Sequence, residues 1–236
     1  MNGEPERASN APRVDVWTFA LDVAPDFPCP VAQASAAEVE APVAHSPAAE
    51  RSLAAWALAR AALSETLGLA SHEAVIDRSR GKPRLLGVPH SLSLSHSGPW
   101  ALFAVSADVE VGVDLERIDP DVAVERLAAR FFAPREAAAL QALKPAARRE
   151  AFFRIWTRKE AVLKACGGGV PSRLRRVLVP LDDSGREAAV LDGAGGEARW
   201  LVQSLAAPVG YAAAIATSAP AAVWQHEAPK RTRSSR

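Results

Sequence analysis

Apolar and polar residues alternate along several short stretches of the chain, a period of two that predicts β-strands. The clearest case is Val109–Arg117, in which valines and a leucine take every second position and Glu110, Gly112, Asp114 and Glu116 share the opposite face. Alternation also predicts strands at 13–23 and 91–97. Further strands are predicted at 100–106, which is apolar and reads as a buried strand, and at 175–181, 198–205 and 211–217. A Gly-Pro pair at 98–99 makes two of these a hairpin with His96 at its tip.

Helical spacing predicts helices at about 48–69, 122–130, 134–144 and 147–166. The last contains the run 152–166, which consists mostly of good helix formers and ends at a glycine triplet. On a helical wheel its large apolar side chains form one stripe, with Glu160 and Lys164 together at the edge. Lys159 points into this stripe, where a cation costs free energy unless an anion meets it.

The order of the predicted elements is strand, helix, hairpin, and then strand, helices, hairpin. This order predicts an α+β fold made of two halves of similar plan. We expect a disordered leader at 1–12, an N-terminal half at 13–106, a C-terminal half at 107–226 and a basic, disordered tail at 227–236. Within the first half, the proline-rich residues 24–46 are expected to form a long connection.

Composition narrows the class of protein. The 236 residues are 49% hydrophobic, enough for a sizeable core, and the net charge of +1 gives no global field that favours nucleic acid or a membrane surface. The two cysteines, Cys29 and Cys166, lie far apart and have no metal-ligand spacing. No apolar run is long enough to cross a bilayer, and no signal core precedes Arg13. We therefore expect a cytoplasmic protein.

Three carboxylates are candidates for a metal site. Asp114 and Glu116 project from one face of a strand, and a divalent cation such as Mg²⁺ would relieve their repulsion. Gly112 beside them would leave room for a ligand, and Glu160 would complete the site from the helix. Considered alone, the pair is more often a solvated strand face, and Glu160 with Lys164 is a common helix-stabilising pair.

Phosphate-binding groups precede these carboxylates. Ser95, His96 and Ser97 at a hairpin tip offer hydroxyl and imidazole donors that suit a phosphate, although a lone histidine is more often a surface or capping residue. Lys82, before Pro83, and Arg51, near the start of the first long helix, are by default solvated side chains.

Taken jointly, these segments resemble a known family. Residues 112–116 (GVDLE) followed by 156–164 (WTRKEAVLK) are similar to the paired signature G-[IV]-D-x-E … W-[ST]-x-K-E-A-x-x-K of 4'-phosphopantetheinyl transferases of the type that activates surfactin synthetase. Upstream, 81–83 (GKP) and 94–97 (LSHS) match further segments of the family in the right order, and 131–136 (FFAPRE) resembles another. The resemblance covers about residues 50–217.

The resemblance implies a fold, an activity and a site. Coenzyme A would bind between two pseudo-symmetric α+β halves, and its phosphopantetheine arm would pass to a serine of an acyl or peptidyl carrier protein, with release of adenosine 3',5'-bisphosphate. Asp114, Glu116 and Glu160 would hold Mg²⁺, while Glu160 as general base and Lys164 as pyrophosphate ligand would be catalytic. The coenzyme A contacts would come from Arg51, Lys82, Ser95, His96, Lys159 and Lys164.

One departure and two alternatives accompany this interpretation. Family members often clamp the 3'-phosphate with basic residues in the N-terminal quarter, but residues 21–50 contain no Lys or Arg. Either Arg51 substitutes for them or the clamp is weaker. A Mg²⁺-dependent nuclease or phosphohydrolase could use the same carboxylates with water, although the net charge suggests no basic groove for a polyanion. In a non-catalytic binding module they would be ordinary surface residues.

We expect a monomer whose carrier-binding surface lies around 120–150.

Overall fold

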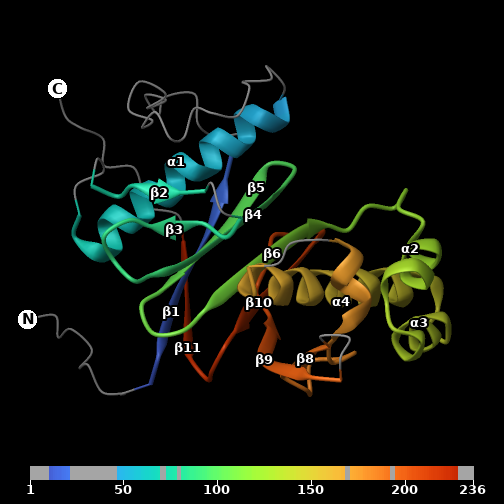
Figure 1. The fold of residues 1–236 in the computed structure, drawn as a ribbon. Helices are drawn as coiled ribbons and strands as arrows, with labels where there is room; N and C mark the ends of the chain where they lie inside the picture. Colours follow the sequence, from blue (N-terminus) through green and yellow to red (C-terminus); the bar gives the residue numbers. More distant parts are fainter. Residues whose placement is uncertain are drawn as a thin grey trace, which may run out of the picture.

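The computed structural model describes residues 11–21, 47–69, 73–78, 81–167, 171–191 and 195–227. The predicted leader, except for its last two residues, the connection at 24–46 and residues 228–236 of the predicted tail lie outside this range. Two sheets and four α-helices make up the described chain, which confirms the predicted α+β class (Figure 1).

The first sheet carries one long helix on one face. Its strand order is β11-β1-β5-β4-β3-β2, made of β1 (Arg13–Ala20), β2 (Ile76–Asp77), β3 (Arg84–Leu85), β4 (Ser91–Ser97), β5 (Trp100–Ser106) and β11 (Ala222–Glu227). Helix α1 (Pro47–Leu67) begins with a proline, whose fixed φ suits the first turn of a helix. Its buried face consists of alanines and one leucine, and small side chains let the helix lie close to the strands.

The second sheet lies against the longest helix of the C-terminal region. Its order is β6-β10-β9-β8-β7, from β6 (Val111–Arg117), β7 (Val177–Leu178), β8 (Glu187–Leu191), β9 (Glu197–Ser204) and β10 (Tyr211–Thr217). Helix α4 (Pro145–Ala165) runs along β6 and β10, while α2 (Val124–Phe131) and α3 (Pro134–Gln141) lie beyond its N-terminal end (Figure 1). A short 3₁₀ helix, η3 (Pro171–Arg176), leads into β7.

Three apolar clusters hold these layers together. One lies between α1 and the first sheet, and one between α4 and the second sheet. The third joins β1 and β5 of the first sheet to β6 and β10 of the second, through residues such as Val16, Leu102, Val113 and Ile215. The two sheets therefore share a core, and β4 lies beside β6 where they meet.

Several elements differ from the sequence prediction. The strand predicted at 175–181 is reduced to two residues, because 171–176 form a 3₁₀ helix. Strands β2, β8 and β11 were not predicted from the sequence. Strand β11 pairs in parallel with β1, so Glu227 ends a strand instead of starting a tail, and residues 222–227 extend the first sheet. The division of the chain near residue 107 stays a prediction.

Helix α4 is buried on nearly every side, which corrects the single apolar stripe expected from the wheel. Between Ala151 and Ala165, the partly exposed positions are Arg154, Trp156, Glu160 and Lys164. The last three are four residues apart and therefore lie on one face of the helix. This face is where Glu160 and Lys164 reach the surface.

Gly112 sets the distance between β6 and α4. A Cβ atom at this position would lie 2.1 Å from the carbonyl oxygen of Ala161 and 2.4 Å from the backbone nitrogen of Ala165. The sequence predicted that Gly112 leaves room for a ligand. In the structure, the backbone of α4 fills this space. Close packing of α4 on β6 thus requires glycine here.

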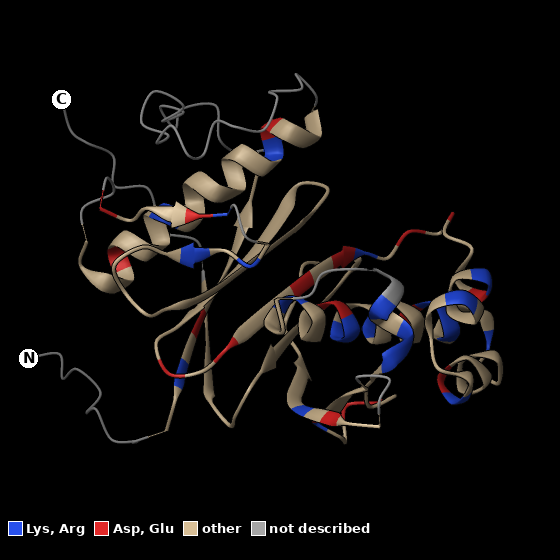
Figure 2. Ribbon diagram, viewed as in Figure 1, with Lys and Arg blue, Asp and Glu red and all other residues tan. Residues whose placement is uncertain are grey.

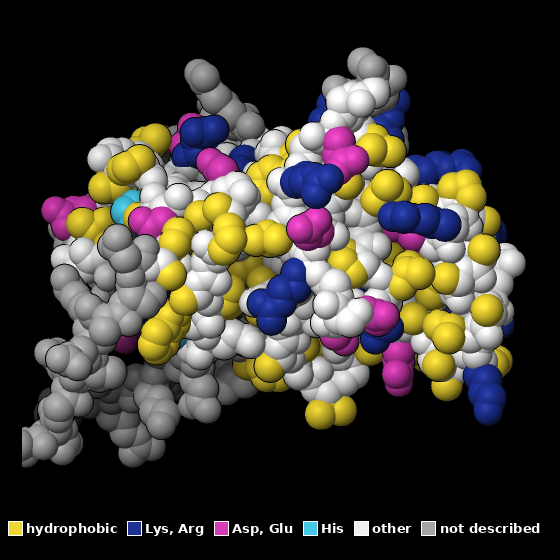
Figure 3. Space-filling view, turned by 90° about the horizontal axis from the view of Figure 1, so that it is seen from below, with side chains coloured by type: hydrophobic (Ala, Val, Ile, Leu, Met, Phe, Trp, Pro, Cys, Tyr) yellow, Lys and Arg dark blue, Asp and Glu magenta, His cyan; other side chains and the backbone are white. Residues whose placement is uncertain are grey.

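On the face shown in Figure 3, Lys and Arg side chains are interspersed with hydrophobic and acidic ones and form no continuous basic strip. No helix within the described ranges combines the length and the apolar character that a bilayer crossing needs.

Candidate active site

The predicted catalytic side chains meet where β4, β6 and α4 come together. Lys164 Nζ on α4 donates to Asp114 Oδ1 on β6 at 2.7 Å, and Ser95 Oγ on β4 donates to the same oxygen at 2.8 Å. Acidic positions along β6 face acidic and basic positions on α4 in Figure 2. Residues from three separate elements therefore converge on one carboxylate.

Asp114 is buried but incompletely paired. Its exposed fraction is 3%, and Oδ2 has no hydrogen-bond partner among the described residues. A buried carboxylate oxygen without a partner costs free energy, because the interior solvates charge poorly. This oxygen is thus available to a cation or to a hydrogen-bond donor of a ligand.

The charged forms of the two other carboxylates, Glu116 and Glu160, are disfavoured by their surroundings. Burial, together with repulsion from Asp114 and Glu160, raises the pKa of Glu116 to about 7, although Ser97 and Lys164 act in the opposite direction. Burial also raises the pKa of Glu160, with repulsion from Asp114 as the second cause. Lys164 therefore does not fully compensate the negative charge of the cluster.

His96 and Arg51 lie near the same charges. Burial lowers the pKa of His96, and Lys164 and Arg51 lower it further. These interactions connect α1 with β4 and α4 across the site. A neutral imidazole beside two cations can accept or donate a hydrogen bond to a bound phosphate.

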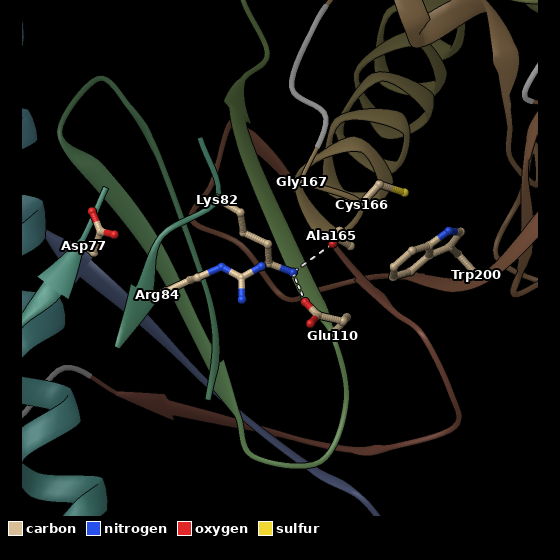
Figure 4. A pocket seen from close by; sticks show the side chains of 8 residues that line it. All are labelled: Asp77, Lys82, Arg84, Glu110, Ala165, Cys166, Gly167 and Trp200. Carbon is tan, nitrogen blue, oxygen red and sulfur yellow. Dashed lines mark hydrogen bonds and ion pairs between the residues drawn. The ribbon is translucent and has the colours of Figure 1, made fainter. Parts of the chain in front are cut away.

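Lys82 borders a cleft next to these groups. Its ammonium donates to the carbonyl oxygen of Ala165 at 2.8 Å and pairs with Glu110, and burial lowers its pKa. The cleft has a volume of about 780 Å³ and is lined by Asp77, Lys82, Arg84, Glu110, Ala165, Cys166, Gly167 and Trp200 (Figure 4). Charges of both signs and the Trp200 indole line it, so it can take a polar ligand with an aromatic ring.

Lys159 does not reach this surface. Its side chain is fully buried, and Nζ lies 2.7 Å from Glu136 Oε2 and donates to the carbonyl oxygens of Leu174 and Val177. Burial lowers the pKa of the ammonium, which Glu136 opposes. The anion that the sequence analysis expected beside Lys159 is thus Glu136 of α3. The predicted contact of Lys159 with coenzyme A does not agree with this buried position.

The carboxylates provide donors for a divalent cation, without forming a closed cage. No group of three His, Cys, Asp or Glu side chains in the described part of the chain is close enough to be a preformed metal site. The unpartnered Asp114 Oδ2 and the repulsion among Asp114, Glu116 and Glu160 nevertheless favour the binding of a cation here. Oxygen donors of this kind suit Mg²⁺, which keeps several waters.

Two contacts around the site were not predicted from the sequence. Ser97 Oγ donates to Glu116 Oε2 at 3.1 Å, and Glu110 pairs with Lys82. A signal for Ser97 was present, because residues 91, 93, 95 and 97 are all serine and alternate residues of a strand face the same way.

Comparisons with known proteins agree with this arrangement. A family model described as the 4'-phosphopantetheinyl transferase superfamily matches residues 110–216. The 4'-phosphopantetheinyl transferase psf-1 of Bacillus pumilus is 35% identical over 178 residues, which is 74% of this chain and 73% of that protein. HetI of Nostoc sp. is 41% identical over 128 residues, and AcpT of Escherichia coli K12 is 40% identical over 114. The chain spans about half the length of these two, at 53% and 57%. Because the match to psf-1 covers most of both chains, this chain belongs to the 4'-phosphopantetheinyl transferase superfamily.

Proposed function

We propose that this chain transfers the 4'-phosphopantetheine arm of coenzyme A to a serine hydroxyl of an apo acyl or peptidyl carrier protein. Family membership supports the reaction class. The observation that carries the assignment is the convergence of Ser95, Asp114 and Lys164, with one Asp114 oxygen left unpartnered. The motifs shared with the surfactin-synthetase-activating type support that subtype.

In the proposed reaction the carrier serine oxygen forms a bond to the phosphorus that bears the pantetheine arm. The bond from this phosphorus to the bridging oxygen breaks, and adenosine 3',5'-bisphosphate leaves with that oxygen. Glu160 takes the serine proton, and its raised pKa makes the carboxylate a stronger proton acceptor. Lys164 stabilises the charge that develops on the leaving phosphate.

Asp114, Glu116 and Glu160 would hold Mg²⁺. A bound Mg²⁺ would supply charge stabilisation at the pyrophosphate oxygens. Before it binds, Lys164 holds Asp114, and Ser95 and Ser97 hold Asp114 and Glu116.

The nucleotide end of coenzyme A would lie near His96, Arg51 and the cleft beside Lys82. The Lys82 ammonium is already engaged by Glu110 and the Ala165 carbonyl oxygen, so its contribution would require release from one of them. Ser95 is 7% exposed and donates to Asp114, and it would support the site mainly through that bond. We expect the carrier protein to dock around residues 120–150 and the enzyme to act as a monomer.

Intact mass of an apo carrier protein, after incubation with this protein, coenzyme A and Mg²⁺ or EDTA, tests the proposal. We expect a Mg²⁺-dependent gain of one phosphopantetheine group, lost in Asp114→Ala and retained in Glu187→Gln, a surface carboxylate on β8. No gain with fatty-acid, polyketide and nonribosomal-peptide carriers, together with no coenzyme A binding, would refute the transferase assignment. Full activity of folded Asp114→Ala would refute the metal assignment.

A further inference from the structure

Serine side chains connect the two sheets where β4 runs beside β6. Ser91 Oγ accepts from the Val111 backbone N–H at 3.0 Å, and Ser93 Oγ accepts from the Val113 N–H at 3.0 Å. Four residues beyond Ser93, Ser97 Oγ accepts from the backbone N–H of Arg117 at 3.1 Å. We call these three hydroxyls the serine ladder. Strands β4 and β6 belong to different sheets, so the backbone N–H groups of β6 on this side bond to serine hydroxyl oxygens. Within one sheet, carbonyl oxygens of the neighbouring strand would accept these bonds.

The last member of the serine ladder also touches a carboxylate of the candidate site. Ser97 Oγ donates to Glu116 Oε2 at 3.1 Å while it accepts from the N–H of Arg117. A hydroxyl has one proton and two lone pairs, so both bonds can exist together. The N–H bond fixes the oxygen, and the proton then points to Glu116. Ser93, by contrast, has the same ladder bond and is hydrogen-bonded to no carboxylate of the described residues.

The turn after Ser97 is fixed against the second sheet. Gly98 has a φ of +56°, and a Cβ atom there would lie 2.8 Å from the Tyr211 hydroxyl. Tyr211 on β10 is the register partner of Arg117 on β6. Ser97 is therefore held from two directions, by its bond to the Arg117 N–H and by the turn resting on Tyr211.

We propose that Ser97 is a positioning residue whose hydroxyl orients the Glu116 carboxylate for a divalent cation shared with Asp114 and Glu160. The inference rests on the proposed function of this carboxylate cluster. Hydrogen bonds to metal-binding carboxylates fix their orientation, and their loss typically lowers metal affinity or activity by about 10–100-fold. A side chain outside the reacting atoms would thus control how well the metal is held.

The test compares Ser97→Ala with Ser93→Ala, which removes a ladder bond without touching Glu116. Isothermal titration calorimetry measures the Kd for Mg²⁺ in the presence of coenzyme A and without carrier protein. We expect the Kd to rise about 10-fold in Ser97→Ala, to stay within about two-fold in Ser93→Ala, and to recover in Ser97→Thr, which keeps the hydroxyl. Circular dichroism establishes that each variant is folded.

A purely structural role makes the opposite prediction. Ser93 is more buried than Ser97, so Ser93→Ala would then be at least as harmful to the Kd. Equal Kd values for Ser97→Ala and the unmodified protein, or equal losses in both alanine variants, overturn the proposal, as does an unmodified protein that binds no Mg²⁺. Failure of the unmodified protein to modify any carrier while it binds Mg²⁺ overturns the transferase function alone, since the Kd comparison still decides the role of Ser97.

Discussion

Replacing Lys159 by methionine should show that this lysine stabilises the fold and does not bind substrate. The ammonium lies 2.7 Å from Glu136, and both side chains are fully buried. Glu136 also accepts from the backbone N–H groups of Ala133 at 2.8 Å and Val179 at 3.2 Å. Lys159→Met leaves this carboxylate without its counter-charge, in a position that water does not reach.

The expected loss in the free energy of unfolding can be estimated from the burial of the Lys159–Glu136 ion pair. Breaking a buried ion pair by removing one partner costs about 3–5 kcal/mol. Because a chain of this size loses about 2–4 °C of Tm per kcal/mol, Lys159→Met should lower the Tm by roughly 6–20 °C. Adding Glu136→Gln removes the stranded charge, so the double variant should recover part of this loss, with a coupling of about 0.5–3 kcal/mol.

Thermal unfolding followed by circular dichroism, without coenzyme A or metal, measures these values. Coenzyme A affinity is measured separately by calorimetry at a temperature at which Lys159→Met is folded, and we expect it to change less than about two-fold. An unchanged Tm together with a coenzyme A affinity reduced about 10-fold would refute the structural role and restore the contact implied by the family resemblance.

Three further predictions concern the same region. Gly112→Ala should lower the free energy of unfolding by roughly 3 kcal/mol or more, because its Cβ would lie 2.1 Å from a backbone oxygen of α4. Gly185→Ala is the control: its Cβ would meet a proline ring at 3.0 Å, and it should cost far less in the same melting experiment. Trp156→Ala should cost about 3 kcal/mol, since the indole packs on three Phe rings, and an unchanged Tm would contradict this packing. In EDTA, stability should fall as the pH rises from about 4.5 to about 7, because the folded-state pKa of Glu116 is raised to about 7 and its charged form is disfavoured there. Glu116→Gln should flatten this part of the Tm-against-pH curve, and an identical curve would contradict the assignment.

Elements with a strong local period could be predicted from the sequence. The hairpin of β4 and β5 has alternating side chains and a Gly-Pro turn, and α4 has uninterrupted helix formers up to its glycines. Strand β11 has no comparable signal, because its pairing partner is β1, some 200 residues earlier in the chain. A strand that depends on such a distant partner is stabilised by tertiary contacts, which local propensity does not contain.

The candidate site could be predicted in part for a similar reason. Spacing on one strand and one helix is local, and it identified Asp114, Glu160 and Lys164, which the structure brings together. The wheel also indicated that Lys159 needs an anion, but it did not identify Glu136, which lies on another helix. The glycine at 112 illustrates the same limit, because a sequence shows that space is needed and does not show which group fills it.

The site combines side chains that repeat every second residue along a strand with side chains that repeat every turn of a helix, and Gly112 lets the strand and the helix pack closely. Strand β6 presents a carboxylate every second residue, while α4 presents Glu160 and Lys164 one turn apart. The missing side chain at 112 lets the helix backbone lie directly on the strand, and Lys164 Nζ of that helix lies 2.7 Å from Asp114 Oδ1. Ser95 and Ser97 then repeat the strand period from β4, so each carboxylate on β6 meets its own hydroxyl. The geometry of the site therefore depends on strand and helix contacts that are set by residues without any chemical role.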